Sequence, residues 1–141
     1  MLPLIKPYLP PKNNLMPRLE KIIYSGYIAE GETVIEFEDK LSKLLDNPYC
    51  LTVNSGTAAL HIALTLIGIG PEDEVISTAL TAEPTNTTIA LTGASVVFAD
   101  LDLETGLLNP SSIESCITEK TKAIMVVHYA DMVCDMNRIN E

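Results

Sequence analysis

The chain has 141 residues, of which 47% are hydrophobic and 20% charged, and its 19 acidic and 9 basic residues give a formal net charge of −10. This length suits about one globular domain. The acidic balance argues against nucleic-acid binding, which needs a basic patch, and no apolar run approaches the roughly 18 residues of a membrane span. The first residues lack the basic leader and apolar core of a secretory signal, so we expect none.

Residues 1–48 are predicted to form an arm followed by two helices. The predicted segments are a proline-rich extended arm over 1–14, helices over about 15–25 and 32–45, and a loop between them at 25–31. In both helices the apolar residues recur at helical spacing, and Asn47 and Pro48 end the second one. We therefore separate 1–48 from the remainder, 49–141, where the pattern changes.

From residue 49 onward, short apolar runs alternate with helical patterns. The strand predictions are 50–54, 74–78, 95–99 and 122–128, and the helix predictions are 56–67, about 83–92 and 110–117. Short runs rich in Val and Ile are typical of strands covered on both faces. Strand–helix–strand alternation predicts a mostly parallel sheet with flanking helices and right-handed crossovers, so the fold class is α/β.

The turn Asn54-Ser-Gly-Thr-Ala-Ala59 joins the first predicted strand to an apolar helix. Gly56 allows a tight turn, and the backbone N–H groups that follow, from Thr57 onward, lie at the free helix N-terminus. Unpaired N–H groups and the positive end of the helix dipole together favour a bound phosphate. A purely structural strand-to-helix junction is the alternative interpretation, because small residues are common at such turns.

Other residues that could carry chemistry have simpler interpretations. Gly68-Ile-Gly70 closes a helix where a dinucleotide fingerprint would open one, so Gly68 or Gly70 is better explained as a left-handed C-cap. His61 lies on an apolar helix and reads as structural. His128 follows a predicted strand at the end where ligands bind in open α/β sheets, and both a structural and a catalytic role stay open.

The sequence predicts no metal site. Asp100 and Asp102 follow the third strand, but no histidine or further carboxylate clusters with them, so a solvated loop explains them better. Cys50, Cys116 and Cys134 are far apart and form no Cys-x-x-Cys pair. Neither a disulfide framework nor a zinc site is indicated, and a reducing cytoplasm is the simplest setting.

A series of segments along the whole chain resembles the DegT/DnrJ/StrS family of pyridoxal-phosphate-dependent nucleotide-sugar aminotransferases. The matching segments, in family order, are Ser25-Gly-Tyr-Ile-Ala-Glu-Gly31, Val34-Ile-Glu-Phe-Glu38, Val53-Asn-Ser-Gly-Thr-Ala-Ala-Leu-His61, Gly68-Ile-Gly-Pro-Glu-Asp-Glu-Val-Ile76, Thr92-Gly-Ala94, Val97-Phe-Ala-Asp-Leu-Asp102, Ile117-Thr-Glu-Lys-Thr-Lys-Ala-Ile124, Val127-His-Tyr129 and Cys134-Asp-Met136. No single segment is decisive, but the ordered series is specific.

This resemblance implies an incomplete fold-type-I aminotransferase large domain with pyridoxal 5′-phosphate as its cofactor. Gly56, Thr57 and Ala58 match the positions that hold the cofactor phosphate in the family, and Tyr27 matches a loop near the sugar. The implied reaction moves an amino group, typically from glutamate, to a nucleotide-linked keto-sugar, as in polysaccharide or lipopolysaccharide biosynthesis. A homodimer is implied for the complete enzyme, with no nucleic-acid or membrane partner.

Some positions depart from the family pattern. Ala82 stands where the family commonly has an aromatic residue over the cofactor ring, and Asp131 stands where a small residue is usual. The family's cofactor-binding lysine and the aspartate that pairs with the pyridine nitrogen lie beyond Glu141, and Lys120 and Lys122 belong to another motif. We therefore assign no catalytic residue.

Three hypotheses follow. The first is an N-terminal part of a sugar aminotransferase, inactive alone, whose strand at 50–54 lacks much of its pairing and leaves a marginal fold. The second is a non-catalytic remnant that binds a partner subunit or a phosphorylated ligand. The third, a free-standing phosphate-binding α/β module, requires the sheet to close without further strands and is the least favoured.

Overall fold

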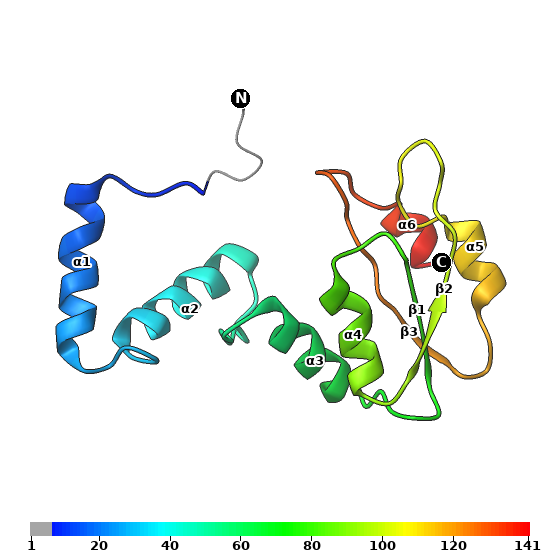
Figure 1. Cartoon of the computed structure of the whole chain (residues 1–141), viewed down its shortest axis with the longest axis horizontal. Coiled ribbons are helices and arrows are strands. Elements are labelled where there is room, and N and C mark those ends of the chain that lie inside the picture. The colour runs from blue at the N-terminus through cyan, green and yellow to red at the C-terminus, as the bar shows by residue number, and fades with distance from the viewer. Residues whose placement is uncertain (1–6) are drawn as a thin grey trace. The chain divides into compact units, whose positions relative to one another are not determined.

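The computed structural model describes residues 7–141. The chain packs as two compact units, one ending at Thr52 and the other running from Val53 to Glu141, and each is described by itself (Figure 1). Within residues 7–141, no helix combines the length and apolar character that a membrane crossing requires.

The first unit contains two helices, α1 (Lys12–Ser25) and α2 (Glu32–Leu45). Both match the sequence prediction, although α1 begins a little earlier than expected. The first ends at Gly26, whose φ of 81° places it in the left-handed region that glycine adopts without steric cost. The second ends at Asp46, which is also left-handed.

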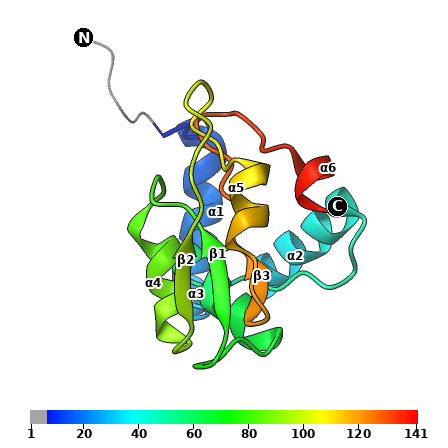
Figure 2. The same cartoon turned by 90° about the vertical axis from the view of Figure 1, so that its right-hand side faces the viewer.

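The second unit is an α/β sandwich around a short parallel sheet. Its elements are α3 (Gly56–Leu66), β1 (Glu74–Ser77), α4 (Glu83–Leu91), β2 (Ser95–Phe98), α5 (Pro110–Cys116), β3 (Thr121–Ile124) and α6 (Met136–Ile139). The strand order is β2-β1-β3 with parallel pairing throughout, and Figure 2 shows β1 between its two neighbours. The predicted α/β class with a parallel sheet and flanking helices is confirmed.

Alternate residues of the central strand face two different cores. Val75 packs with Leu64 of α3 and Ile89 of α4, whereas Ile76 packs with Ile113 of α5 and with Cys134. Val75, Ile76 and Ile89 have no exposed surface. Because successive strand side chains point to opposite faces, this alternation places α3 and α4 on one face and α5 and α6 on the other (Figure 1).

The prediction of a strand at 50–54 is wrong. None of the strands among the described residues pairs with this segment, and the sheet order is complete without it. The amide of Thr52 instead donates to the carboxylate of Glu38 at 2.6 Å. A strand needs a neighbour to receive its backbone hydrogen bonds, so an apolar pattern alone does not form one.

The strand β3 is shorter than the strand predicted at 122–128, and the short helix α6 was not predicted. The ladder continues one bond past Ile124, from the Met125 amide to the Ile76 carbonyl at 2.7 Å, and then stops because β1 ends at Ser77. The helix α6 has only four residues, too few for a recognisable apolar period. The predicted left-handed cap after α3 is confirmed at Gly68, with φ of 79°.

Candidate functional site

The order of the strands creates a topological switch point. From β1 the chain leaves through α4 to β2 on one side, and β3 lies on the other side of β1 and leads toward α6. The chain therefore leaves the carboxyl ends of β1 and β3 toward opposite faces of the sheet. In open α/β sheets, ligands bind in the crevice beyond the carboxyl ends at such a point.

The helix α3 begins on the same face as α4, and its first turn presents free backbone donors. Ser55 is extended and its Oγ accepts from the Ala58 amide at 3.1 Å, while its carbonyl accepts from Ala59 at 3.1 Å. Within residues 7–141, the amides of Gly56 and Thr57 donate no hydrogen bond. The amide of Ala58, the third predicted phosphate contact, is therefore already hydrogen-bonded to the N-cap side chain.

The surroundings of these two amides suit an anion. Both Gly56 and Thr57 are exposed, and a Cβ added to Gly56 would meet no atom within 4 Å. The first turn of α3 carries no acidic residue. Free N–H groups together with the helix dipole would bind the oxygens of a phosphate. The residues present therefore fit the phosphate group of the implied cofactor.

A polar network follows the carboxyl end of β1. Ser77 donates to the Asn86 Oδ1 at 2.7 Å, and the Asn86 Nδ2 donates to the Thr78 carbonyl at 3.0 Å. The Thr78 hydroxyl accepts from the Leu80 amide at 3.1 Å. Sequence reasoning missed Asn86, because nothing in a local pattern shows that a helix residue will face the preceding strand.

His128 lies beyond the carboxyl end of β3, and one of its two ring nitrogens accepts a hydrogen bond. Its Nδ1 accepts from the Cys134 amide at 3.2 Å, and the Cys134 thiol donates to the Val127 carbonyl at 3.3 Å. Between them, Tyr129 and Met132 form an isolated bridge around a tight turn. His128 is exposed and has a definite structural partner, so the structural interpretation has direct support.

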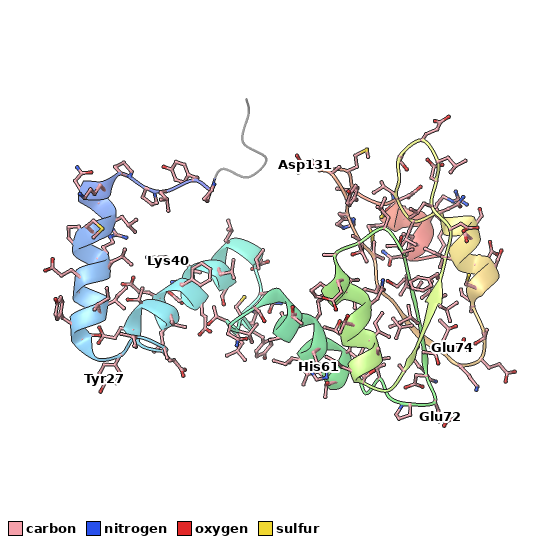
Figure 3. The ribbon with its side chains drawn as sticks, in the orientation of Figure 1. Tyr27, Lys40, His61, Glu72, Glu74 and Asp131 are labelled. Carbon is pink, nitrogen blue, oxygen red and sulfur yellow. The ribbon has the colours of Figure 1, made fainter. Side chains whose placement is uncertain are left out.

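The lysines of the second unit lie at the other end of the sheet. Lys120 precedes β3, and its carbonyl accepts from the Glu74 amide at 2.9 Å, at the amino end of β1. Lys122 lies within β3 and is exposed. Figure 3 shows Glu74 and Asp131 at opposite ends of this unit. Neither lysine is placed to reach a ligand at the carboxyl ends of the strands.

Tyr27 belongs to the first unit. It lies in the loop after α1 and is 74% exposed, and within residues 7–141 its side chain makes no hydrogen bond (Figure 3). In the same unit, the amide and then the hydroxyl of Thr52 hold the pKa of the Glu38 carboxyl below its usual value. This contact joins the end of the unit to α2.

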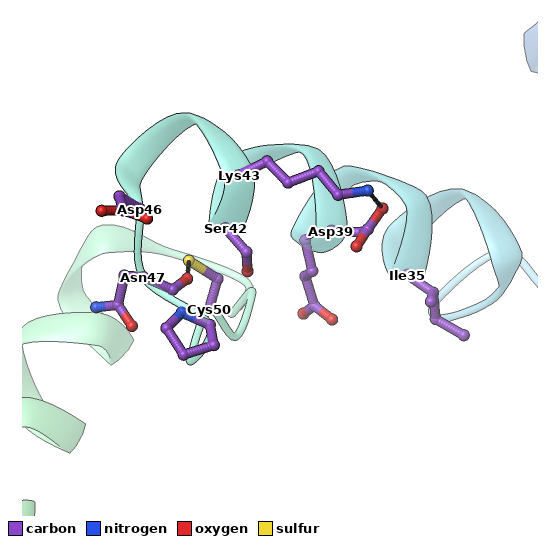
Figure 4. A pocket seen from close by; sticks show the side chains of 9 residues that line it. Ile35, Asp39, Ser42, Lys43, Asp46, Asn47 and Cys50 are labelled. Atoms are coloured by element: carbon purple, nitrogen blue, oxygen red, sulfur yellow. Dashed lines mark hydrogen bonds and ion pairs between the residues drawn. The ribbon is translucent and has the colours of Figure 1, made fainter.

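Two open grooves lie elsewhere. One of about 510 Å³ runs along α2 and includes Asp39, Lys43 and Cys50 (Figure 4). The other, of about 810 Å³, lies beyond β2, and its lining includes Asp100, Asp102 and also Ala79, which follows β1. Both contain carboxylates, which disfavour a phosphate. Within residues 7–141, no set of three or more metal-ligating side chains comes together.

Comparisons with known proteins agree with the fold. The model of the DegT/DnrJ/EryC1/StrS aminotransferase family matches residues 11–141. The spore coat polysaccharide biosynthesis protein SpsC of Bacillus subtilis (strain 168) is 43% identical over 115 residues, which is 82% of this chain and 30% of that protein.

Solved structures extend the likeness. The sugar aminotransferase CalS13 from Micromonospora echinospora matches at 35% identity with a TM-score of 0.90, over 99% of this chain and 38% of that chain. Spr1654 from Streptococcus pneumoniae in its PMP form matches at 33% identity with a TM-score of 0.91, over 99% of this chain and 35% of that chain. The chain thus spans about a third of the length of these relatives, and Spr1654 is also known in a PLP form. On this evidence, the chain belongs to the DegT/DnrJ/EryC1/StrS aminotransferase family.

Proposed function

We propose that this chain is the phosphate-binding, N-terminal part of a pyridoxal-phosphate-dependent aminotransferase. Its substrate would be a nucleotide-linked keto-sugar, and its amino donor would be glutamate or a similar amino acid. Family membership supports amino transfer, and the relatives SpsC and CalS13 support sugar and polysaccharide chemistry. Residues 49–141 would act as a partial cofactor-binding domain, and residues 1–48 as its arm and helices.

The observation that carries this proposal is the pair of free amides at Gly56 and Thr57, at the exposed N-terminus of α3. They would hold the cofactor phosphate through N–H···O contacts, which are strong when the acceptor is charged. When bound, the cofactor would supply the electron sink that amino transfer requires. The role of this chain is then to bind and orient the phosphate end.

The chain would be inactive alone, because Lys120 and Lys122 lie at the amino end of the sheet. The lysine that binds the cofactor at the carboxyl ends of the strands would have to lie outside this chain's second unit. The complete enzyme would be a homodimer. The three cysteines are free, which fits a reducing compartment such as the cytoplasm.

A second candidate is a non-catalytic remnant that binds a partner subunit or a phosphorylated ligand. Large apolar side chains of α3 and its C-cap are exposed, with Leu66 at 81% and Ile67 at 64%. Such exposure favours a protein contact. Ala82 and Asp131, which depart from the family pattern, would be tolerated in a chain that no longer performs catalysis.

Titration with pyridoxamine phosphate tests the proposal, because this form has no aldehyde and cannot attach to surface lysines. We expect wild-type chain to bind it, and Gly56→Pro to weaken binding about tenfold by removing one charged hydrogen bond. Proline is suited to this first helical position, where its fixed φ is helical and its missing N–H breaks no helix bond. Isothermal titration calorimetry measures both affinities.

Two controls sharpen this experiment. Gly56→Ala keeps the amide and should lose much less affinity, and pyridoxamine without phosphate should not bind. If inorganic phosphate binds as tightly as pyridoxamine phosphate, the ring contributes nothing and the second candidate is favoured. If borohydride fixes pyridoxal phosphate to one defined lysine of the chain, the claim that it is inactive alone is wrong.

A further inference from the structure

Asn86 joins the central strand to α4 through both ends of its amide. Its Oδ1 accepts from the Ser77 hydroxyl at 2.7 Å, and its Nδ2 donates to the Thr78 carbonyl at 3.0 Å. The Thr78 carbonyl can only accept, so Nδ2 must face it and Oδ1 must face Ser77. The orientation of this side chain is therefore fixed by chemistry as well as by position.

The partners of Asn86 are among the least exposed polar residues of the unit. Ser77 has no exposed surface and Thr78 is 1% exposed, although they continue a strand whose preceding residues, Val75 and Ile76, are apolar. A buried hydroxyl or carbonyl that loses its partner carries a large desolvation cost. The bonds to Asn86 are thus required for this end of the strand to stay buried.

The loop 79–82 between β1 and α4 follows directly after Thr78, one of the two residues bonded to Asn86. The Leu80 amide donates to the Thr78 hydroxyl at 3.1 Å, and the hydroxyls of Thr81 and Thr85 lie 2.8 Å apart. Ala79, Leu80 and Ala82 are exposed. The loop directly follows the carboxyl end of the strand at the switch point, which is the region where ligands bind in open α/β sheets.

Capping of α4 does not explain Asn86. The N-cap of α4 is Ala82, which makes no side-chain cap bond. Asn86 lies inside the helix, and its amide contacts Ser77, the last residue of β1, and Thr78, which follows it. Asn86 therefore makes no capping contact with the first turn of α4. Its contacts serve the strand end and the loop that follows.

We infer that Asn86 is a positioning residue, which fixes the 79–82 loop as the wall against which the cofactor ring would lie. This inference rests on the proposed function, because it assigns the ring to the switch point and the phosphate to α3. It separates two roles within one site. The amides of Gly56 and Thr57 set affinity, and Asn86 sets the orientation of the ring.

The test uses Asn86→Asp in the full chain, with Asn137→Asp as the matched control. The first variant keeps the size of the side chain but replaces the donor with a carboxylate facing the Thr78 carbonyl. Asn137 is exposed on α6, and within residues 7–141 its side chain makes no hydrogen bond, so the control makes the same charge change outside the network.

Two measurements read out the effect. In Asn86→Asp, amide hydrogen exchange should rise about tenfold at Leu80 while Val75 in the core stays protected, because loss of one buried bond loosens the loop locally. The circular dichroism induced in the ring of bound pyridoxamine phosphate should fall about twofold, since ring placement depends on a rigid wall. The affinity should change little, because the phosphate contacts are intact.

Ser77→Ala keeps the test decisive if Asn86→Asp fails to fold. It removes only the hydroxyl that holds Oδ1, and we expect the same changes at Leu80 and in the ring signal, to a smaller degree. Unchanged exchange and ring signal in a folded variant would overturn the inference, as would equal effects from Asn137→Asp. If wild-type chain binds no pyridoxamine phosphate, the proposed function itself fails and the inference falls with it.

Discussion

At the scale of single residues, the turn after β3 contains a strained alanine. Ala130 and Asp131 have φ of 51° and 61°, and the turn closes with a bond from the Met132 amide to the Tyr129 carbonyl at 3.0 Å. The left-handed region costs a non-glycine residue about 1 kcal/mol or more. Two successive residues in this region match a type I′ turn, in which glycine is favoured.

Ala130→Gly should therefore stabilise the chain by about 0.5 kcal/mol, after the greater freedom of glycine in the unfolded state is subtracted. Urea denaturation followed by far-ultraviolet circular dichroism measures the change. Ala63→Gly, at an exposed position inside α3, is the control and should destabilise by about 1 kcal/mol. A loss of stability in Ala130→Gly would show that the turn is not strained.

Glu38 should make its contact with Thr52 sensitive to acid. The folded-state pKa of this carboxyl is lowered from 4.5, first by the Thr52 amide and then by the Thr52 hydroxyl. A lowered pKa means that the contact contributes fully above the unfolded value and is lost as pH falls through the folded value. The midpoint of the loss thus lies below 4.5.

The Thr52 amide resonance, followed by NMR from neutral to acid pH, checks this expectation. In wild-type chain it should shift with a midpoint below the usual value for glutamate. In Glu38→Gln, whose amide oxygen can still accept from Thr52 but cannot titrate, the shift should vanish. A wild-type midpoint at or above that usual value would contradict the contact.

At the scale of elements, the side-chain cap of α3 would compete with the proposed phosphate for one amide. The Ser55 Oγ accepts from Ala58 at 3.1 Å, so one N–H of the first turn is already paired. An N-cap side chain contributes about 1 kcal/mol to helix stability. Removing it would weaken the helix while giving an anion a third donor.

Ser55→Ala should thus lower the free energy of unfolding by about 1 kcal/mol while strengthening pyridoxamine phosphate binding, because the Ala58 amide becomes a third donor. The opposite signs distinguish a ligand site from a helix end that only needs capping. Asn109→Ala removes the equivalent cap of α5, where Oδ1 accepts from Ser111 at 3.0 Å. It should cost similar stability and leave binding unchanged. Loss of binding in Ser55→Ala alone would mean that the hydroxyl itself contacts the ligand.

The elements also show where sequence patterns succeed. The helices over 32–45, 56–67, 83–92 and 110–117 were predicted within a residue or so of their observed ends, because each has its own turn or cap residues. The strand at 50–54 failed, although its apolar pattern resembles that of β1. A helix satisfies its hydrogen bonds within itself, whereas a strand depends on a neighbour elsewhere in the chain.

At the scale of the whole molecule, a buried core and exposed apolar surface coexist. The sheet of the second unit buries Val75 and Ile76 completely, while Leu66 and Leu103 remain largely exposed. The chain spans about a third of its relatives' length. The proposed phosphate contacts, Gly56 and Thr57, and the two lysines of this unit, Lys120 and Lys122, all lie within Val53–Glu141.

The sequence by itself determined the α/β class, most helices, the family and the turn at Gly56, because periodicity, caps and short motifs are local properties of a chain. Only the tertiary structure decided three things. It showed that, within residues 7–141, the segment 50–54 has no strand partner, that the Ala58 amide donates to the Ser55 hydroxyl, and that Asn86 faces the end of β1. Each depends on which distant or competing groups meet in space, and hydrogen-bond pairing between such groups leaves no periodic signal in a sequence.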